Sequence, residues 1–478
     1  MLFPTVDFAI FFVVVLTGSW LLRPFPTRWK LFILTASFFF YGYFRWYYVL
    51  LLGGSIVFNW WVGQRIFDSL GPDSVRTNAS RWLVRLAVTV NLGALGFFKY
   101  AEFSLSTSTD VMERLGLDLD PPFLSILLPV GISFFTFQAI SYVMDIGRGE
   151  WRHPMKLLDF AVYLSFFAHL VAGPIVRASE FAWQLERRPD PREVESSEAF
   201  MLIFRGLFKK VVVSSYMATI VDPIFSFPDA HNGWETTWGV YAYAIQIYAD
   251  FSGYTDIAIG VALLLGIRFP QNFDAPYRAL SVQEFWRRWH MTLSRWLRDY
   301  LYIPLGGNHG SKLFTYRNLF LTMLLGGLWH GANWTFVIWG ALQGGYLIAE
   351  RVIKERWARR APLGWPTWLV RSLQWLLTFN LICFAWIFFR ATSLDNALDV
   401  VGQLASLEGA VTLVTPLLVF TVIAMLASQF VPPQVPRRAE IAFARLAPVV
   451  QIALLAVGLV VVNALGPEGI APFIYFQF

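Results

Sequence analysis

The sequence predicts an all-α polytopic membrane protein with about eleven transmembrane helices, together with re-entrant and interfacial helices. Hydrophobic residues make up 56% of the 478-residue chain and charged residues only 15%, whereas a soluble domain carries about 25% charged residues. Apolar runs of about 18 residues or more recur along almost the whole chain. The basic residues lie between those runs, as they do in cytoplasmic loops. This composition argues against a soluble globular enzyme.

The apolar runs mark the expected crossings in order along the chain. Two of them, 31–62 and 313–348, are each long enough for two helices, since one crossing takes about 20 residues. Gly173 and Pro174 interrupt a third run, which indicates a broken or re-entrant helix. No internal repeat or linker divides the chain, so we expect one membrane domain over residues 1–478. The approximate limits of the runs are 5–22, 31–62, 82–99, 122–145, 157–176, 200–220, 236–266, 313–348, 368–390, 412–430 and 447–464.

Charges in the loops predict which side of the membrane each loop faces. Loops 101–121 and 221–235 carry mainly Asp and Glu, and we expect them outside. Loops 268–317 and 351–371 carry mainly Arg and Lys, and we expect them in the cytoplasm. The net charge of +6 therefore reflects membrane topology, and no nucleic-acid partner is expected. The N-terminal run lacks the features of a cleaved signal peptide, so we expect a retained first helix.

Metal and cofactor motifs are missing from the sequence. The single cysteine, Cys383, lies in an apolar run, which excludes a disulfide framework or a cysteine-based metal site within one chain. The histidines show no HExxH spacing, so a zinc site is unsupported. Gly306 and Gly307 form a tight turn without the spacing of a nucleotide-binding loop. We therefore expect no metal and no bound cofactor.

His330 is the first candidate for chemistry. It lies in LLGGLWHGANW, between Trp329 and Trp334, in a run that we expect at membrane depth. An ionisable side chain in such a place suggests a functional site. Burial among apolar groups favours a neutral imidazole that can accept a proton. A structural hydrogen bond to a neighbouring helix is the alternative.

His290 is the second candidate, in the stretch 282–298. There the tryptophans recur at helical spacing opposite arginines, which predicts an amphipathic helix near the cytoplasmic interface. His290 falls on the tryptophan side and should point inward. A basic anchor for lipid headgroups remains the alternative for the helix as a whole. The apolar side has Trp286, Trp289, Leu293, Trp296 and Leu297, and the basic side has Arg287, Arg288, Arg295 and Arg298.

The remaining histidines are weaker candidates. His169 lies in the broken apolar run and is expected to make a structural hydrogen bond or to line a cavity. His231 lies in an acidic outward loop, and we expect it to be solvated. His153 and His309 should likewise be solvated loop residues.

The stretch 246–260, QIYADFSGYTDIAIG, is unusually polar for a membrane segment. Asp250 and Asp256 would each cost several kcal/mol inside a crossing unless they are paired. Arg177 or the arginines of 278–298 could supply the partners. The sequence leaves two interpretations open. The carboxylates form either a functional site, which relays protons or binds a substrate hydroxyl, or a structural ion pair.

Two long runs and two shorter ones together resemble one known family. They are FPQNFDAPYRALSVQEFWRRWHMTLSRWLRDYLYIPLGG at 269–307, YRNLFLTMLLGGLWHGANWTFVIWG at 316–340, LVAGPIVR at 170–177 and QIYADFSGYTDIAIG at 246–260. In this order they resemble the membrane-bound O-acyltransferases, and within them the bacterial branch that includes alginate O-acetylation and teichoic-acid D-alanylation proteins. The terminal PFIYFQF is similar as well.

The resemblance implies a fold and a pair of site residues. It implies a ring of helices around a central funnel or tunnel, with the catalytic motifs at 120–350 and additional helices at 400–478. It also implies that His330, in WHG, is needed for acyl transfer and that His290, in RRWH, is the second family histidine. We expect His330 to act as general base on a hydroxyl, and His290 to position the thioester carbonyl or to stabilise the oxyanion.

The resemblance also implies the substrates. We expect a cytoplasmic thioester donor, acetyl-CoA or an acyl carrier, whose phosphates would be attracted by the basic residues of 278–298. The acceptor hydroxyl would arrive from the opposite side. The residues expected to bind substrate are Arg287, Arg288, Arg298, Asn272, Asp250, Tyr254 and Trp329.

Taken together, these expectations describe an acyltransferase of the inner membrane. The enzyme would move acetyl across the membrane for O-acetylation of an exported polysaccharide such as alginate. The resemblance alone implies a periplasmic partner. We expect membrane lipids to surround the protein. Tyr475 is a candidate acetyl relay, with interfacial anchoring of the terminal aromatic residues as the alternative. The alternatives for the function are D-alanyl or acyl transfer to teichoic acid, peptidoglycan, lipid or protein, and, more distantly, a transporter that couples protons through Asp250, Asp256 and the histidines.

Overall fold

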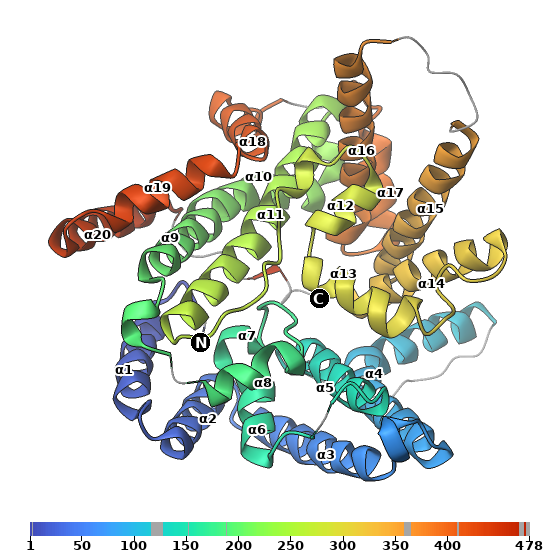
Figure 1. Ribbon diagram of the computed structural model, residues 1–478. Helices are drawn as coiled ribbons and strands as arrows, with labels where there is room; N and C mark the ends of the chain where they lie inside the picture. Colours follow the sequence, from blue (N-terminus) through green and yellow to red (C-terminus); the bar gives the residue numbers. More distant parts are fainter. Residues whose placement is uncertain are drawn as a thin grey trace. The chain divides into compact units, whose positions relative to one another are not determined.

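The all-α class that the sequence predicts is confirmed (Figure 1). The computed structural model describes residues 1, 3–115, 128–151, 153–187, 189–357, 365–408, 411–467 and 473–474. Over these ranges the regular elements are helices, without any strand. The helices form two compact units, which we describe separately. Unit 1 comprises Met1–Ser196 and Val261–Pro270, and unit 2 comprises Ser197–Gly260 and Gln271–Phe478.

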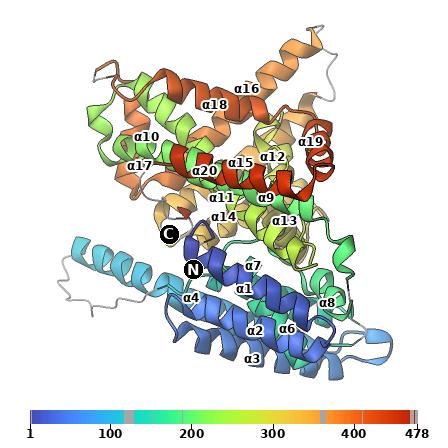
Figure 2. The same cartoon turned by 90° about the vertical axis from the view of Figure 1, so that its left-hand side faces the viewer.

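Unit 1 contains the N-terminal helices, and the predicted division of the run 31–62 into two helices is confirmed. Helices α1, α2 and α3 lie side by side, with α6 packed against α2 and α3 (Figure 2). The bounds are α1 Val6–Leu22, α2 Pro26–Gly42, α3 Tyr48–Asp68, α4 Asn78–Arg114, α5 Ile132–Gly147, α6 Leu157–Ser165, α7 Phe167–Leu170 and α8 Ala178–Glu186.

The broken helix in unit 1 differs in one detail from the prediction. The break lies at Phe166, between α6 and α7, several residues before Gly173 and Pro174. Beyond it, Nε2 of His169 lies 2.9 Å from the carbonyl oxygen of Tyr163. The ring of His169 is fully buried among aromatic side chains. His169 therefore makes the structural hydrogen bond that we expected.

Unit 2 contains the helices that carry both candidate histidines. The run 313–348 forms two helices, as predicted, which meet at residues 331–333. The bounds are α9 Ser196–Leu207, the π-helix η3 Phe208–Ser214, α10 Ser215–Ser226, α11 Gly233–Leu264, α12 Val282–Arg288, α13 Met291–Leu297, the π-helix η6 Arg298–Tyr302, α14 Lys312–His330, α15 Trp334–Trp357, α16 Thr367–Arg390, α17 Leu394–Gln403, α18 Pro416–Ser428, α19 Gln434–Ala444 and α20 Pro448–Leu465.

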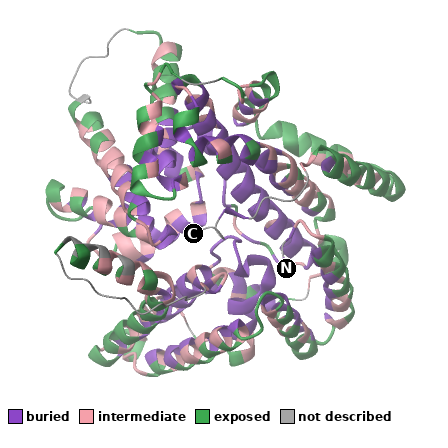
Figure 3. Cartoon of the chain, turned by 180° about the vertical axis from the view of Figure 1, so that it is seen from behind, coloured by how far each residue is buried: buried purple, intermediate pink, exposed green. Residues whose placement is uncertain are grey.

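Helix α11 is the buried centre of unit 2 (Figure 3). Its backbone approaches α9 closely, because a Cβ at Gly206 would lie 2.5 Å from the carbonyl oxygen of Gly253. Small residues at a crossing allow two helices to pack backbone to backbone, as is common in membrane proteins. This contact brings the lysines that follow α9 next to the carboxylates of α11.

Helices α14 and α15 make a second close crossing, and it supports His330 at the end of α14. A Cβ at Gly340 would lie 2.6 Å from the carbonyl oxygen of Met323 and 3.0 Å from Cα of Leu324. No residue other than glycine fits there without moving the helices apart. Two helices that follow each other in the chain thus form an antiparallel pair with its connection beside the site.

The lengths of the helices and the exposure of their apolar residues agree with a multi-pass membrane protein. Four of the described helices are long and apolar enough to cross a membrane, and they lie within α4, α11, α16 and α20. Helices α1 and α18 are apolar but shorter. Only 6% of the residues in the apolar window of α20 are buried within the protein, as expected for a helix that faces lipid. The count of about eleven crossings stays a prediction.

Gly340→Ala should destabilise the protein because the added methyl group meets the backbone of α14. We expect the free energy of unfolding to fall by about 1–3 kcal/mol. Thermal melting of the purified protein in detergent measures the loss as a lower Tm. Gly345→Ala on the same helix is the matched control, because its Cβ meets nothing within 4 Å. Equal losses in both variants would show that the crossing does not limit stability.

Candidate functional site

His290 lies at an abrupt break between two short helices of unit 2. The sequence predicts one amphipathic helix over 282–298, and this prediction is wrong in one respect: α12 ends at Arg288, and α13 starts at Met291. At the break His290 adopts left-handed backbone angles, with φ 42° and ψ 55°. This conformation costs a residue with a Cβ about 1–3 kcal/mol, and strained residues of this kind cluster at functional sites. The inward orientation that we expected is confirmed, since His290 has 0% exposure.

The imidazole of His290 has one polar contact and several aromatic ones. Its Nδ1 lies 3.1 Å from Oδ1 of Asn272, and its ring stands edge-on to Phe251 with the centroids 4.7 Å apart. Nε2 is buried and has no hydrogen-bond partner within the described ranges. His290 lies outside the described helices that are long enough to cross a membrane. Burial lowers its pKa to about 3, so the ring is neutral at physiological pH.

His330 is the last residue of α14 and lies in an aromatic enclosure. Its ring centroid is 4.9 Å from that of Trp329, 5.0 Å from Trp339 and 5.1 Å from Phe389. These side chains come from α14, α15 and α16. His330 is buried. The enclosure therefore holds the imidazole in apolar surroundings, as the sequence predicts.

Trp329 connects the two histidines. Its ring centroid is 4.9 Å from that of His330 and 6.4 Å from that of His290. Two histidines that are 40 positions apart in sequence thus lie next to the same indole ring. The structure brings together three of the predicted site residues, and a fourth, Asn272, contacts His290 directly.

Asp250 and Tyr254 lie on the same side of α11, beside the C-terminal segment. The carboxylate of Asp250 is fully buried and forms an ion pair with Lys210, while Oδ2 accepts a hydrogen bond from the backbone N of Ile474 at 2.8 Å. The ring of Tyr254 lies 4.7 Å from that of Phe473. Tyr475, the proposed relay, lies outside the described residues. The binding of substrate by Asp250 and Tyr254 stays a prediction.

The second carboxylate of α11 also has cationic partners. Oδ1 of Asp256 accepts from Arg205 and Oδ2 accepts from Lys209, each at 2.8 Å. The partners of both carboxylates come from α9 and the π-helix η3, instead of the arginines that we expected. A π-helical turn is a frequent feature of functional sites, and here it presents Lys209 and Lys210 to two different carboxylates.

The three arginines predicted to bind the donor have different surroundings. Arg287 is exposed. Arg288 is half-buried and donates to Glu284 at 3.0 Å and to Asp274 at 2.7 Å. Arg298 is exposed, pairs with Asp299 at 2.6 Å and lines a cavity. Of the three, Arg298 is therefore the one placed to meet a ligand in that cavity.

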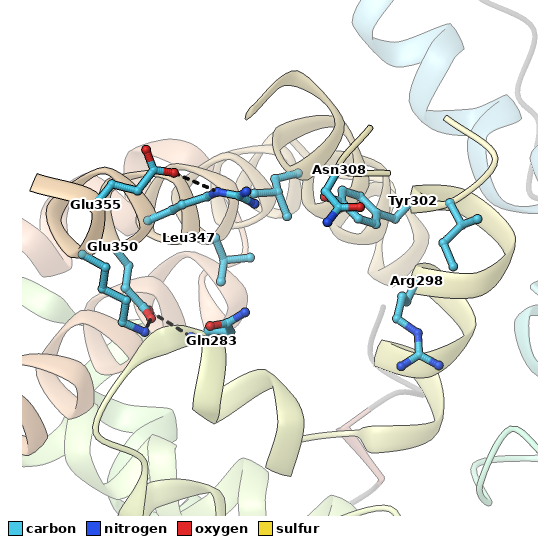
Figure 4. A pocket seen from close by; sticks show the side chains of 11 residues that line it. Gln283, Arg298, Tyr302, Asn308, Leu347, Glu350 and Glu355 are labelled. Carbon is cyan, nitrogen blue, oxygen red and sulfur yellow. Dashed lines mark hydrogen bonds and ion pairs between the residues drawn. The ribbon is translucent and has the colours of Figure 1, made fainter. Parts of the chain in front are cut away.

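The cavity has a volume of about 580 Å³ and lies between η6, α14 and α15 (Figure 4). Arg298 comes from one wall, and Glu350 and Glu355 come from the opposite wall (Figure 4). Arg351 and Lys354 complete a rim with three cationic and two acidic groups. Its lining residues are Gln283, Arg298, Tyr302, Ile303, Asn308, Leu319, Leu347, Glu350, Arg351, Lys354 and Glu355.

Arg351 and Lys354 line the cavity, and the sequence did not single them out as candidates. The sequence places them in a cytoplasmic loop, whereas the structure places them in the last turns of α15. Their spacing carries a signal, because Glu350 with Lys354 and Arg351 with Glu355 are pairs at i, i+4. Such pairs indicate a helix, although they do not indicate a cavity.

The other polar clusters do not indicate a metal site. Within the described residues no group of three His, Cys, Asp or Glu side chains could hold an ion. The prediction that His231 is solvated is wrong. His231 is buried, and its Nδ1 lies 2.7 Å from the carboxylate of Glu235, which in turn accepts from the backbone N of Thr412 and Leu413. This cluster ties the start of α11 to the segment before α18.

Comparisons with known proteins agree with the motifs of unit 2. Residues 148–393 match the model of the MBOAT, membrane-bound O-acyltransferase, family. The "Probable alginate O-acetylase AlgI" of Azotobacter vinelandii is 43% identical over 400 residues, which is 83% of this chain and 76% of that protein. The "Peptidoglycan O-acetyltransferase" of Helicobacter pylori is 41% identical, over 80% of this chain and 74% of that protein. The "Teichoic acid D-alanyltransferase" of Bacillus subtilis is 28% identical, over 54% of this chain and 68% of that protein.

Lys210→Met should destabilise the protein strongly because it leaves the carboxylate of Asp250 buried without its cation. We expect the free energy of unfolding to fall by about 3–5 kcal/mol. The Lys210→Met, Asp250→Leu double variant removes both charges and should recover most of this loss. Thermal melting in detergent measures both effects.

Asp222→Asn is the matched control for the loss of one charge, since it breaks the more exposed pair with Arg390. It should change stability by less than about 1 kcal/mol. If the double variant is no more stable than Lys210→Met alone, the unpaired carboxylate is not the cause of the loss.

Proposed function

Because this chain belongs to the membrane-bound O-acyltransferase family, we propose that it moves acetyl from a cytoplasmic thioester to a hydroxyl of an exported polysaccharide such as alginate. The family and the O-acetyltransferase relatives identify it as an O-acyltransferase. The observation that carries the proposal is the pair of buried histidines in contact with Trp329. Both lie within the residues that match the family.

The histidine His330 supports acyl transfer through general-base catalysis. The oxygen of the acceptor hydroxyl attacks the thioester carbonyl carbon, and His330 takes the hydroxyl proton. The carbon–sulfur bond then breaks, and protonated His330 returns the proton to the thiolate, which leaves as the thiol. The apolar enclosure of Trp329, Trp339 and Phe389 excludes water, which limits hydrolysis of the thioester. The role of His290 depends on which of its ring nitrogens carries the hydrogen.

The cavity at η6 and α15 is the entrance that we propose for the donor. Its rim carries the cationic groups of Arg298, Arg351 and Lys354, which can bind the phosphate groups of a ligand such as acetyl-CoA. The loop charges support a cytoplasmic position for this rim. The donor carries its acetyl thioester at the end of a long arm, so binding of its phosphates at the rim leaves the thioester free to reach inward.

The acceptor lies on the outer side of the membrane in this proposal. We place the chain in the inner membrane, with the outward loops available to a periplasmic partner that completes the transfer. Peptidoglycan is the second candidate acceptor, because a relative of similar identity is named for it. Measuring ester-linked acetyl separately in the secreted polysaccharide and in purified peptidoglycan distinguishes the two.

His330→Ala should remove acetyl transfer, because the hydroxyl then has no base. In a deletion strain complemented with the variant, we expect ester-linked acetyl on the polymer to fall by about 10²-fold or more. The yield of polymer and the level of protein in the membrane should stay normal. His153→Ala, at an exposed histidine of unit 1, is the control. Normal acetylation in the His330→Ala strain would remove His330 from the mechanism.

Arg298→Gln combined with Arg351→Gln should weaken the use of the donor. Loss of two cations from the rim removes contacts with phosphate, so we expect the KM for acetyl-CoA to rise about tenfold with a smaller change in kcat. The measurement uses membrane vesicles with the cytoplasmic face outward. Arg192→Gln, at an exposed arginine of unit 1, serves as control. An unchanged KM would mean that the donor enters elsewhere.

A further inference from the structure

The hydrogen-bond pattern around Asn272 carries information about His290. Asn272 is buried. Its Oδ1 accepts from the backbone N of Thr292 at 3.3 Å and from the hydroxyl of Thr292 at 2.9 Å. A backbone N–H can only donate, so the atom that faces it must be the amide oxygen. The backbone N–H of Thr292 therefore places the amide oxygen on this side, and Nδ2 of Asn272 is a buried atom that has no partner among the described residues.

The same oxygen determines the hydrogen on His290. Oδ1 of Asn272 lies 3.1 Å from Nδ1 of His290, and an amide oxygen can only accept. Nδ1 must therefore carry the hydrogen. In a neutral imidazole the other nitrogen, Nε2, then has a lone pair. Nε2 is the buried atom that has no partner among the described residues.

We propose that Asn272 is a positioning residue that holds His290 in the Nδ1–H form, so that Nε2 presents a hydrogen-bond acceptor to the substrate. His290 then receives a hydrogen bond from an O–H or N–H group of the bound substrate. A neutral His290 in this form cannot donate to the thioester carbonyl or to an oxyanion. The inference rests on the proposed acyl transfer and replaces the substrate contact that the sequence suggests for Asn272.

The backbone of Asn272 also holds the segment that carries His290. The carbonyl oxygen of Asn272 accepts from the backbone N of Met291 at 2.9 Å. Asn272 thus contacts the start of α13 through its backbone as well as its side chain. These bonds stabilise the left-handed conformation at His290, which points the ring toward Phe251 and Trp329. Such contacts to a functional histidine fix both its orientation and its tautomer.

Two substitutions of Asn272 test the proposal, because they should change the pH dependence of acyl transfer in different ways. Asn272→Ala removes the acceptor for Nδ1–H, and we expect transfer to fall about 10–100-fold at every pH. Asn272→Asp retains an acceptor oxygen and should keep much of the activity at about pH 8. The carboxylate favours imidazolium, so activity should fall as the pH drops toward about 5.5, because Nε2 is then protonated.

The charged neighbours of His290 are the same in the wild type and in Asn272→Asp. The elements packed against it are α11 through Phe251, the segment 271–275, and α14 through Trp329. The titratable groups next to these contacts are Asp250, Asp274 and His330. Asp250 pairs with Lys210, and Asp274 pairs with Arg288. The new carboxylate is therefore the one change near the ring.

The assay uses cytoplasmic-side-out membrane vesicles from complemented deletion strains, with labelled acetyl-CoA as the probe and acetyl ester on the polymer as the product. The rates of acetyl transfer are divided by the amount of folded protein, which fluorescence-detected gel filtration measures. Asn318→Asp, which places a carboxylate at another buried asparagine of unit 2, is the control, and its pH profile should keep the wild-type shape.

The possible outcomes separate the inference from the proposed function. A loss toward acid pH in Asn272→Asp alone supports the acceptor role of His290. A gain toward acid pH would show that His290 acts as a donor, and full activity of Asn272→Ala would show that Asn272 does not act through His290; either result overturns the inference. Acetyl transfer that persists in His330→Ala, or is absent from the wild type, contradicts the proposed function instead.

Discussion

The burial of charged side chains between helices is the constraint on which unit 2 depends. Asp250 and Asp256 lie in the long central helix, where a lone carboxylate would be costly. The glycine contact between α9 and α11 brings Lys209, Lys210 and Arg205 within reach. Asp250 also binds the backbone of Ile474. The charges therefore join the central helix, the π-helix and the C-terminal segment in one arrangement.

His290 combines two uncommon features, a buried nitrogen without a hydrogen-bond partner among the described residues and left-handed backbone angles. Most buried polar atoms in proteins have a hydrogen-bond partner, and Nε2 of His290 has none within the described part of the chain. The residue also has left-handed backbone angles. A strained backbone and an unpaired atom at the same residue are features that folding alone does not favour. Both are understandable if a substrate supplies the missing partner.

The two parts of the proposed site differ in their chemistry. Aromatic rings surround His330 and limit the access of water, whereas charged groups line the cavity at α15. A thioester with a charged carrier has the same two parts, an apolar reactive end and a polar remainder. This correspondence supports a donor that binds through its carrier at the rim and reacts further inside.

The sequence by itself determined the helical membrane class and the division of the runs 31–62 and 313–348, and it predicted that His290 and His330 face apolar surroundings. These features follow from local properties, because hydropathy and short motifs depend only on residues that are close together in the sequence. The tertiary structure alone decided that Lys210 pairs with Asp250, that a break at His290 interrupts the amphipathic stretch, and that Arg351 lines a cavity. Each depends on residues far apart in the chain, and sequence periodicity contains no information about which distant groups meet.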